Sequence, residues 1–317
     1  MNYHYISSAS LSDIGRRRKN NQDAEVSIPD AGIFCVADGM GGGEAGEVAS
    51  KKVIDAVQSF ANDLHEAPGT EHLKYKMKYL SRTLHRAGCE IFDFAAEQGY
   101  TTCGTTAVIL VFDFNQPRRA GVLHVGDSRL YRLRRGLLTQ ITIDHSAENE
   151  AALGGYELPD SMKHVITRAI GGHEHTEVEQ NFIDVESGDL YLICSDGLSG
   201  MVTDEIIQET LVSNLSEPPG RSVQDLISTA NENGGKDNIT VSLVCVQDFA
   251  GFHEESGELM PYDVDEDDED TLDRPALSGH RLFHKDSDAQ NLDDRTPFSI
   301  FKLNPRCDTP TTLENSE

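Results

Sequence analysis

Apolar positions in the first 100 residues form one short continuous run and two long segments at helical spacing. The run at 33–37 leads directly into Asp38, and four of the next five residues are glycine. An apolar run bounded by glycine predicts a buried strand that delivers this carboxylate at its end. Segments 44–64 and 70–97 are separated by Pro68-Gly69. They predict two amphipathic helices, packed as a hairpin over one face of a sheet.

The second predicted helix divides its residues between a buried face and a solvent-facing one. Leu73, Met77 and Leu80 follow each other at helical spacing, so Met77 is expected in the core. Lysine is almost never fully buried in folded proteins. We therefore expect the three lysines of this segment to face solvent; they are Lys74, Lys76 and Lys78.

The second part of the chain is richer in strand patterns. Strands are predicted at 105–114, 119–125, 128–134, 182–185, 190–194 and from residue 239, and helices at 204–215 and 222–231. Residues 144–160 are polar and irregular, which predicts a surface insertion beside the sheet, and 163–170 predict one more short strand.

The periodic pattern stops near residue 249, and the charge balance changes with it. The chain has a formal net charge of −27; residues 250–317 hold 18 acidic and 6 basic residues, a net of −12. A dense acidic block repels itself and buries too little apolar surface to order. We predict a folded domain at 1–249 and an acidic, disordered tail at 250–317. Short apolar patches in the tail leave a tail-binding partner as the alternative.

Composition also excludes several classes of protein. The strongly acidic balance argues against nucleic-acid binding. No run of about 18 apolar residues appears, which argues against a membrane span, and residues 1–10 lack the pattern of a secretory signal. The six cysteines include no CxxC pair, which indicates reduced thiols. Together these features predict a cytoplasmic protein.

The segment 12–23 joins four consecutive basic residues to a polar run that ends in Asp23. Taken alone, this pattern is typical of a solvated charged loop. The alternative is an anion-binding loop beside a cation site, since arginine can bind phosphate oxygens through two hydrogen bonds.

The candidate site residues are aspartates that end a predicted strand or precede one. Asp38, Asp196 and Asp237 all lie close to glycine, and Asp23 and Asp127 occupy similar edges. A glycine-rich turn is the alternative interpretation of the first of these. Clustered carboxylates resist ionising together unless a cation joins them, and oxygen ligands without paired histidines favour Mg²⁺ or Mn²⁺ over Zn²⁺. Two such ions with an arginine nearby would suit phosphoester hydrolysis.

Eight short motifs follow one another along the chain. They are Asp13-x-Gly15-x-x-Arg18-x-x-Asn21-Gln22-Asp23, Val36-Ala37-Asp38-Gly39-Met40-Gly41-Gly42, Gly104-Thr105-Thr106, Val125-Gly126-Asp127-Ser128-Arg129-x-Tyr131, Leu133 onward to Asp144-His145-Ser146, Thr167-Arg168-Ala169, Cys194-Ser195-Asp196-Gly197-Leu198 and Lys236-Asp237-Asn238-Ile239-Thr240. A single motif match is only a hypothesis, whereas eight at suitable spacing are specific. In this order they resemble the protein phosphatase 2C (PPM) family of metal-dependent Ser/Thr phosphatases in its bacterial form.

The resemblance implies an α+β fold with four layers, an αββα sandwich of two antiparallel sheets flanked by helices. It also implies a set of residue roles. Asp38 would bridge two ions with the carbonyl of Gly39 beside it, and Asp196 and Asp237 would complete one ion's shell. Asp23 would lie in or next to the ligand shell, and Asp127 with Asp196 would help to hold a third ion, bound more weakly than the other two. Arg18 would bind the substrate phosphate.

The sequence departs from the family pattern at the first glycine-rich motif. Histidine is frequent in relatives where this chain has Met40 or Gly43, so no side-chain general acid is evident here. His145, His164, His173 and His175 are interpreted as surface or structural residues.

The function predicted on this basis is Mn²⁺- or Mg²⁺-dependent hydrolysis of phosphoserine and phosphothreonine in proteins, with two ions or three. The partners would be phosphorylated proteins, with a cognate Ser/Thr kinase and its targets. The alternative is a metal-binding pseudophosphatase that acts as an adaptor through its acidic tail.

Overall fold

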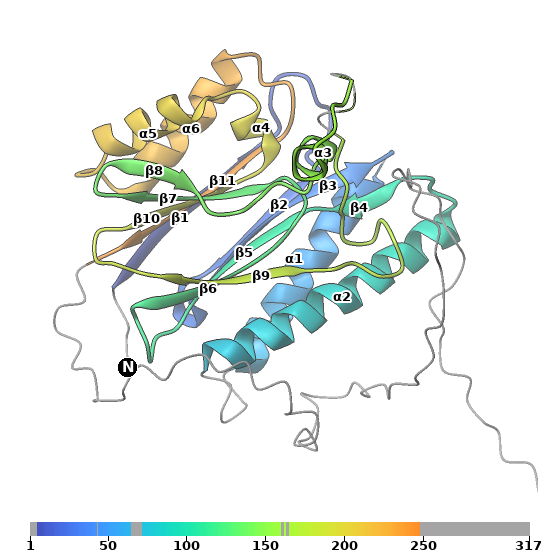
Figure 1. The fold of residues 1–317 in the computed structure, drawn as a ribbon, viewed down its shortest axis with the longest axis horizontal. Coiled ribbons are helices and arrows are strands. Elements are labelled where there is room, and N and C mark those ends of the chain that lie inside the picture. Colours follow the sequence, from blue (N-terminus) through green and yellow to red (C-terminus); the bar gives the residue numbers. More distant parts are fainter. Residues whose placement is uncertain (1–4, 43, 65–71, 160–161, 163–164, 248–317) are drawn as a thin grey trace, which may run out of the picture.

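Two antiparallel sheets packed face to face form the centre of the computed structural model, which describes residues 5–42, 44–64, 72–159, 162 and 165–247 (Figure 1). The first sheet has the strand order β1 (Ile6–Asp13), β11 (Ile239–Val246), β10 (Leu190–Cys194), β7 (Arg129–Arg134) and β8 (Leu137–Gln140). The second has the order β2 (Asp23–Ile28), β3 (Ile33–Gly41), β5 (Ala107–Phe112), β6 (Arg119–Val125) and β9 (Glu179–Asp184), with β4 (Cys103–Thr105) paired to β3.

Helices cover the outer face of each sheet. The long helices α1 (Ala45–Leu64) and α2 (Leu73–Gln98) pack on the second sheet, which confirms the predicted hairpin. The first sheet is covered by α4 (Asp196–Ser199), α5 (Asp204–Ser213) and α6 (Pro219–Glu232). The remaining helical elements are η1 (Pro29–Ala31) and α3 (Ala147–Gly154). The predicted four-layer αββα sandwich is confirmed.

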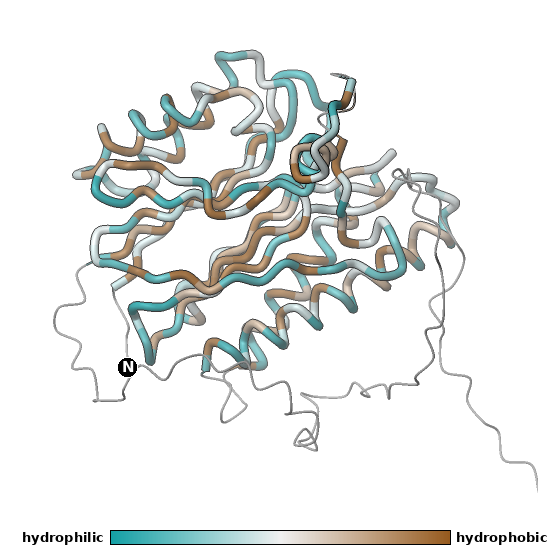
Figure 2. The backbone as a smooth tube through the Cα atoms, viewed as in Figure 1, coloured by the Kyte–Doolittle hydropathy of each residue, from teal (hydrophilic) through white to brown (hydrophobic). Residues whose placement is uncertain are grey.

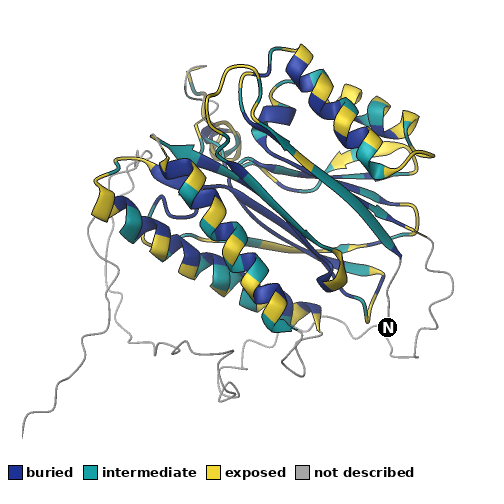
Figure 3. Cartoon of the chain, turned by 180° about the vertical axis from the view of Figure 1, so that it is seen from behind, coloured by how far each residue is buried: buried dark blue, intermediate teal, exposed yellow. Residues whose placement is uncertain are grey.

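Strand β3 shows why the sequence pattern there is a continuous apolar run. Phe34 and Val36 pack in the core between the two sheets, whereas Ile33 and Cys35 pack against α1 and α2. A strand covered on both faces has no solvent side, so both sets of alternating positions are apolar. The hydrophobic colouring along the inner strands (Figure 2) and the buried strands beneath α1 and α2 (Figure 3) show the same arrangement.

The structure corrects several predicted element boundaries. Strand β3 does not end at Asp38 but continues to Gly41, so this aspartate lies within a strand. The segment predicted as a charged loop is flanked by two strands that the pattern missed, β1 and β2. The polar segment 144–160 contains helix α3, whose first turn is capped by Ser146 through a hydrogen bond from the Asn149 N–H. The predicted strand at 163–170 was wrong, because its described residues form only isolated bridges at Ile166 and Ile170.

Lys76 was wrongly predicted to face solvent. Its side chain is buried, and its ammonium group lies 3.3 Å from the carbonyl oxygen of Ala31 and 3.4 Å from that of Phe112. The long aliphatic stem of a lysine can cross an apolar layer while the charge reaches polar groups beyond it. Met77 is in the core, as predicted.

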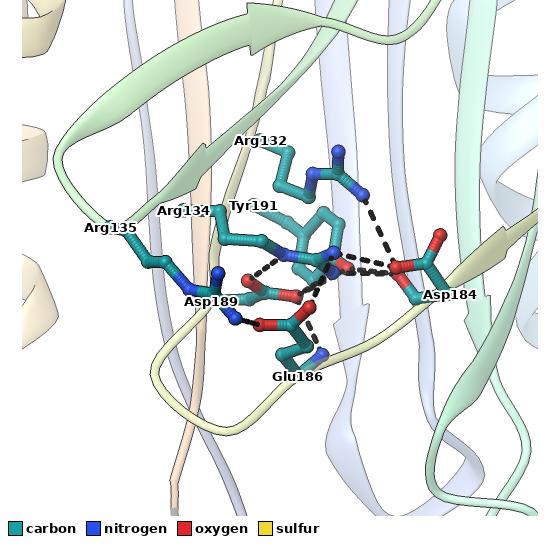
Figure 4. Close-up of polar contacts among 7 residues, drawn as sticks. All are labelled: Arg132, Arg134, Arg135, Asp184, Glu186, Asp189 and Tyr191. Carbon is teal, nitrogen blue, oxygen red and sulfur yellow. Dashed lines mark hydrogen bonds and ion pairs between the residues drawn. The ribbon is translucent and has the colours of Figure 1, made fainter.

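A network of arginines and carboxylates joins the two sheets at one edge (Figure 4). Arg134 on β7 binds both carboxylate oxygens of Asp189, each at 2.7 Å, and also reaches Asp184 of β9 at 2.6 Å. The Asp189 carboxylate is 1% exposed and accepts a further hydrogen bond from the Tyr191 hydroxyl. This network connects β7 of one sheet with β9 of the other.

We expect Arg134→Ala to lower the free energy of unfolding by about 3–5 kcal/mol, because it leaves the buried Asp189 carboxylate without its cation. Arg135→Ala is the matched control; this arginine pairs with Glu186 from an 82% exposed position, and its loss should cost less than about 1 kcal/mol. Chemical denaturation of the full chain measures both. Equal losses would contradict the assignment of the network as a structural junction.

The described helices include none that is both long and apolar enough to cross a membrane. The predicted acidic tail at 250–317 lies outside the described residues, so its predicted disorder stays a prediction.

Candidate active site

Two of the predicted site residues face each other on neighbouring strands. Asp23 begins β2 and is paired in register with Asp38 of β3. The backbone at Asp38 is fixed by Thr106, whose hydroxyl accepts a hydrogen bond from the Asp38 N–H at 3.0 Å and whose own N–H donates to the Asp38 carbonyl at 2.8 Å. Strand pairing thus brings two acidic side chains to one edge of the second sheet.

Gly39 is required by close approach of neighbouring backbone. A Cβ atom at this position would lie 2.1 Å from the carbonyl oxygen of Gly46 and 2.5 Å from that of Gln22. The Gly39 N–H donates to the same Gln22 carbonyl at 3.0 Å. Helix α1 can therefore begin directly against β3 only because both Gly39 and Gly46 lack side chains.

Hydroxyl groups from the first sheet hold Asp23 from across the interface. Its Oδ2 atom accepts hydrogen bonds from Ser195 Oγ at 2.8 Å and from Thr240 Oγ1 at 2.7 Å. The Thr240 N–H in turn donates to Ser195 Oγ at 3.0 Å. Because Ser195 directly precedes Asp196, this bridge places the Asp196 end of β10 beside the Asp23–Asp38 pair.

A second hydroxyl bridge reaches the turn that carries Asp127. Thr106 Oγ1 lies 2.7 Å from Ser128 Oγ, so the threonine that fixes Asp38 also contacts the residue after Asp127. Gly126, just before this aspartate, has a φ of +101°, and a Cβ there would lie 2.5 Å from Thr106 Cγ2. Both constraints fix the turn between β6 and β7 against β5.

The basic loop and the Asp237 turn lie against each other. Arg18 Nη2 is 2.5 Å from Asp237 Oδ2, with both side chains partly exposed. The Asn238 side chain accepts from the Gln22 N–H at 2.8 Å, which ties the turn to the start of β2. A Cβ at Gly15 would lie 2.1 Å from the Asp237 carbonyl oxygen. Arg18 therefore lies at the edge of the acidic cluster, as its predicted role requires.

Burial and neighbouring negative charges raise the pKa values of four carboxyl groups of the site. Burial raises the pKa of Asp38 well above its usual range, and the charges of Asp23, Asp196, Asp127 and Asp237 raise it further. Burial likewise raises the pKa of Asp23 to about 6 and that of Asp127 to about 7, and it raises the pKa of Asp196. Five acidic groups from both sheets therefore form one electrostatic unit.

Comparison with known proteins decides the family. The sequence matches the family model for protein phosphatase 2C over residues 15–242. The chain belongs to the protein phosphatase 2C family. It is 37% identical over 247 residues to the serine/threonine protein phosphatase PstP of Mycobacterium tuberculosis, a match that covers 76% of this chain and 45% of PstP. The chain thus spans about half the length of that relative.

Other known proteins are similar to this chain over nearly their whole length. Protein phosphatase PhpP of Streptococcus pneumoniae is 32% identical over 249 residues, which cover 75% of this chain and 96% of PhpP. The solved structure of PppA, described as a key regulatory component of T6SS in Pseudomonas aeruginosa, gives a TM-score of 0.68 at 34% identity and covers 76% of this chain and 97% of PppA. The PstP catalytic domain in complex with two manganese ions gives 0.66 at 36% identity and covers 77% of this chain and 99% of that domain.

The acidic site of this protein phosphatase 2C member fits divalent cations. Among the described residues, Asp23, Asp127 and Asp196 each have a buried Oδ1 atom without a hydrogen-bond partner. A buried acceptor without a donor is costly, and so is crowding of like charges. Hard divalent cations, which prefer carboxylate and carbonyl oxygens, would relieve both costs.

The structure thus brings together every aspartate that the sequence analysis selected, with Arg18 at their edge. Their individual roles as metal ligands stay predictions. The sequence analysis did not assign roles to the hydroxyl residues that organise the cluster, although all of them lie within the quoted motifs; they are Thr106, Ser128, Ser195 and Thr240. Their position next to the aspartates was the available signal.

Proposed function

We propose that the chain hydrolyses phosphoserine and phosphothreonine in proteins with the help of Mn²⁺ or Mg²⁺, and that it reverses a bacterial Ser/Thr kinase. The observation that carries this proposal is the cluster of five carboxylates, with unpartnered buried oxygens, between the two sheets. Membership of the family and similarity to named Ser/Thr phosphatases support the reaction type. The manganese ions of the PstP catalytic domain support the choice of ion.

Within this proposal the aspartates hold the ions. Asp38 would contribute its carboxylate to two ions with the Gly39 carbonyl beside it, and Asp196 and Asp237 would complete one ion's shell. Asp23 would lie in or next to the ligand shell, and Asp127 with Asp196 would help to hold a third ion. When bound, the ions acidify a water molecule to serve as nucleophile and neutralise charge on the phosphoryl group. Arg18 then has the role of binding and orienting the phosphate.

The pseudophosphatase alternative would need a site that holds ions but cannot use them. All five aspartates are present and converge, which favours the enzyme. A full-chain assay with a phosphothreonine peptide separates the two. The enzyme proposal predicts phosphate release with Mn²⁺ and none with EDTA; ion binding without release at any Mn²⁺ concentration would favour the adaptor.

Arg18→Ala should raise KM by roughly tenfold or more and lower kcat less, because a group that binds substrate and transition state equally changes mainly KM. The exposed neighbour Arg17 gives the matched control, Arg17→Ala, with kinetics expected within about twofold of the parent chain. Steady-state kinetics on the phosphopeptide measure both. A fall in kcat at unchanged KM would instead assign Arg18 to the transition state.

We also propose the finer assignments that accompany this activity: a catalytic domain at 1–249, a cytoplasmic location, Mg²⁺ as an alternative ion, and a signalling role opposite a cognate kinase. The acidic composition of 250–317 supports a separate function for that segment, such as capture of a basic partner. Phosphatase assays on the full chain and on a chain ending at residue 249 test the division. Loss of activity on truncation would contradict it.

A further inference from the structure

A second cluster of ionisable side chains lies beside the turn that carries Asp127. His124, His145 and Glu179 offer ligand-type atoms that all lie within 4.8 Å of one another. Both histidines are buried, and their rings stack with centroids 4.6 Å apart and an interplanar angle of 17°. Two imidazoles and a carboxylate resemble a zinc ligand set, so the cluster is either a metal site or a hydrogen-bonded unit.

The hydrogen bonds decide between these two uses. The Gly126 N–H donates to His145 Nδ1 at 3.1 Å, so this nitrogen must carry a lone pair. Burial lowers the pKa of His145, which keeps its ring neutral at pH 7. The proton of the neutral ring must then be on Nε2, where Glu179 Oε2 accepts it at 3.2 Å. A cation on Nε2 would move this proton to Nδ1, where it would face the Gly126 N–H.

His145 instead holds Gly126 at both of its backbone polar groups. Its ring Nδ1 accepts from the Gly126 N–H, and its backbone N–H donates to the Gly126 carbonyl at 2.9 Å. The adjacent Asp127 has a buried Oδ1 atom without a partner, and on its other side Ser128 is bonded to Thr106. The turn is therefore clamped before and after Asp127, by His145 on one side and by a hydroxyl pair on the other.

We propose that His145, oriented by Glu179, is a positioning residue that sets where the Asp127 carboxylate lies relative to Asp38 and Asp196. This inference rests on the proposed function, in which Asp127 helps to hold the most weakly bound ion. Glu179 belongs to the edge strand β9, and Asp127 follows β6. The hydrogen bonds from Glu179 through His145 to Gly126 therefore connect this edge strand to the site. His145 touches neither substrate nor ion and acts only through Gly126.

Three substitutions separate the two hydrogen bonds of His145. His145→Gln can keep a donor for Glu179 but loses the acceptor for the Gly126 N–H. His145→Asn keeps an acceptor near the Nδ1 position and loses the contact with Glu179. His124→Gln is the matched control, since it alters the stacked ring, keeps a donor for the Ile143 carbonyl now bonded at 2.9 Å, and leaves Gly126 untouched.

Calorimetric titration of the full chain with Mn²⁺ provides the readout, with thermal unfolding of each ion-free variant measured alongside. His145→Gln is expected to weaken the weakest Mn²⁺ site by roughly 10–100-fold and to leave the affinity of the tighter sites close to the parent values. Its unfolding temperature should fall only modestly, because one backbone N–H loses its acceptor. His145→Asn should recover most of that affinity, and His124→Gln should resemble the parent.

Several results would overturn the inference. One is an unchanged Mn²⁺ affinity of the weakest site in His145→Gln. Another is an equal loss of affinity at every site of that variant, together with a large fall in its unfolding temperature. The third is the loss of a bound ion in His124→Gln, which would make the cluster a metal site. Failure of the proposed function looks different, because the parent chain itself would then release no phosphate from the phosphopeptide at any Mn²⁺ concentration.

Discussion

Asp38→Asn is expected to reduce phosphopeptide hydrolysis by at least about 10³-fold, because removal of a single group that stabilises transition-state charge already costs about 10²–10³. The carboxylate of Asp38 interacts with the other four aspartates of the site, and in the proposed function it would serve two ions. The amide retains the size of the side chain but not its charge. Initial rates at saturating Mn²⁺ measure the effect.

The control for this substitution is Asp113→Asn. Asp113 is also buried and directly follows β5, at the end of that strand opposite Thr106, where its carboxylate accepts from the Asn115 N–H at 2.9 Å. An asparagine oxygen can accept the same bond, so activity should stay within about twofold of the parent. Comparable losses in the two variants would mean that the Asp38 result reflects folding, not chemistry.

The ion-free protein is expected to become less stable as pH rises from 4 to 8. In the unfolded chain aspartates ionise near pH 4, whereas in the folded protein burial raises the pKa of Asp23 to about 6 and of Asp127 to about 7. Below pH 4 both states are protonated and these groups contribute nothing. Between 4 and 7 the folded state binds more protons, so the free energy of unfolding falls, by on the order of 3 kcal/mol for each carboxyl.

Mn²⁺ should reverse this trend, because the ions replace the protons on the carboxylates. Chemical denaturation of the EDTA-treated full chain at pH 5 and pH 8, with and without Mn²⁺, measures both effects. Asp127→Asn should flatten the slope of the ion-free protein relative to the parent chain. A slope equal to that of the parent would remove Asp127 as a source of the effect.

The sequence predicted the parts of the fold that are specified by apolar spacing. The continuous run of β3 and the helical spacing of α1 and α2 report burial directly, and all three elements formed, although β3 extends beyond its predicted end. Strand β1 was missed because its sequence, rich in serine, carries no such pattern. It is held by backbone pairing with β11 along all eight of its residues, which is information that only the folded sheet contains.

The candidate site, too, was predicted only in part from the sequence. The aspartates stood out because several of them follow an apolar run and adjoin glycine, and strand register and side-chain contacts bring them together in the structure. Their supports did not stand out, since Ser195 and Thr240 become partners of Asp23 only when β10 and β11 pack against β2 across the sheet interface. The prediction for Lys76 was also wrong, because its ammonium group contacts carbonyl oxygens of segments that are distant in the sequence.

The central claim is that carboxylates from both sheets form one site for divalent cations. Equilibrium dialysis of the full chain against Mn²⁺ at pH 7.5, followed by elemental analysis, counts the bound ions directly. We predict at least two Mn²⁺ per chain in the parent protein, and loss of both tightly held ions together in Asp38→Asn. A parent chain that binds less than one Mn²⁺, or a variant that binds as many ions as the parent, would contradict the account.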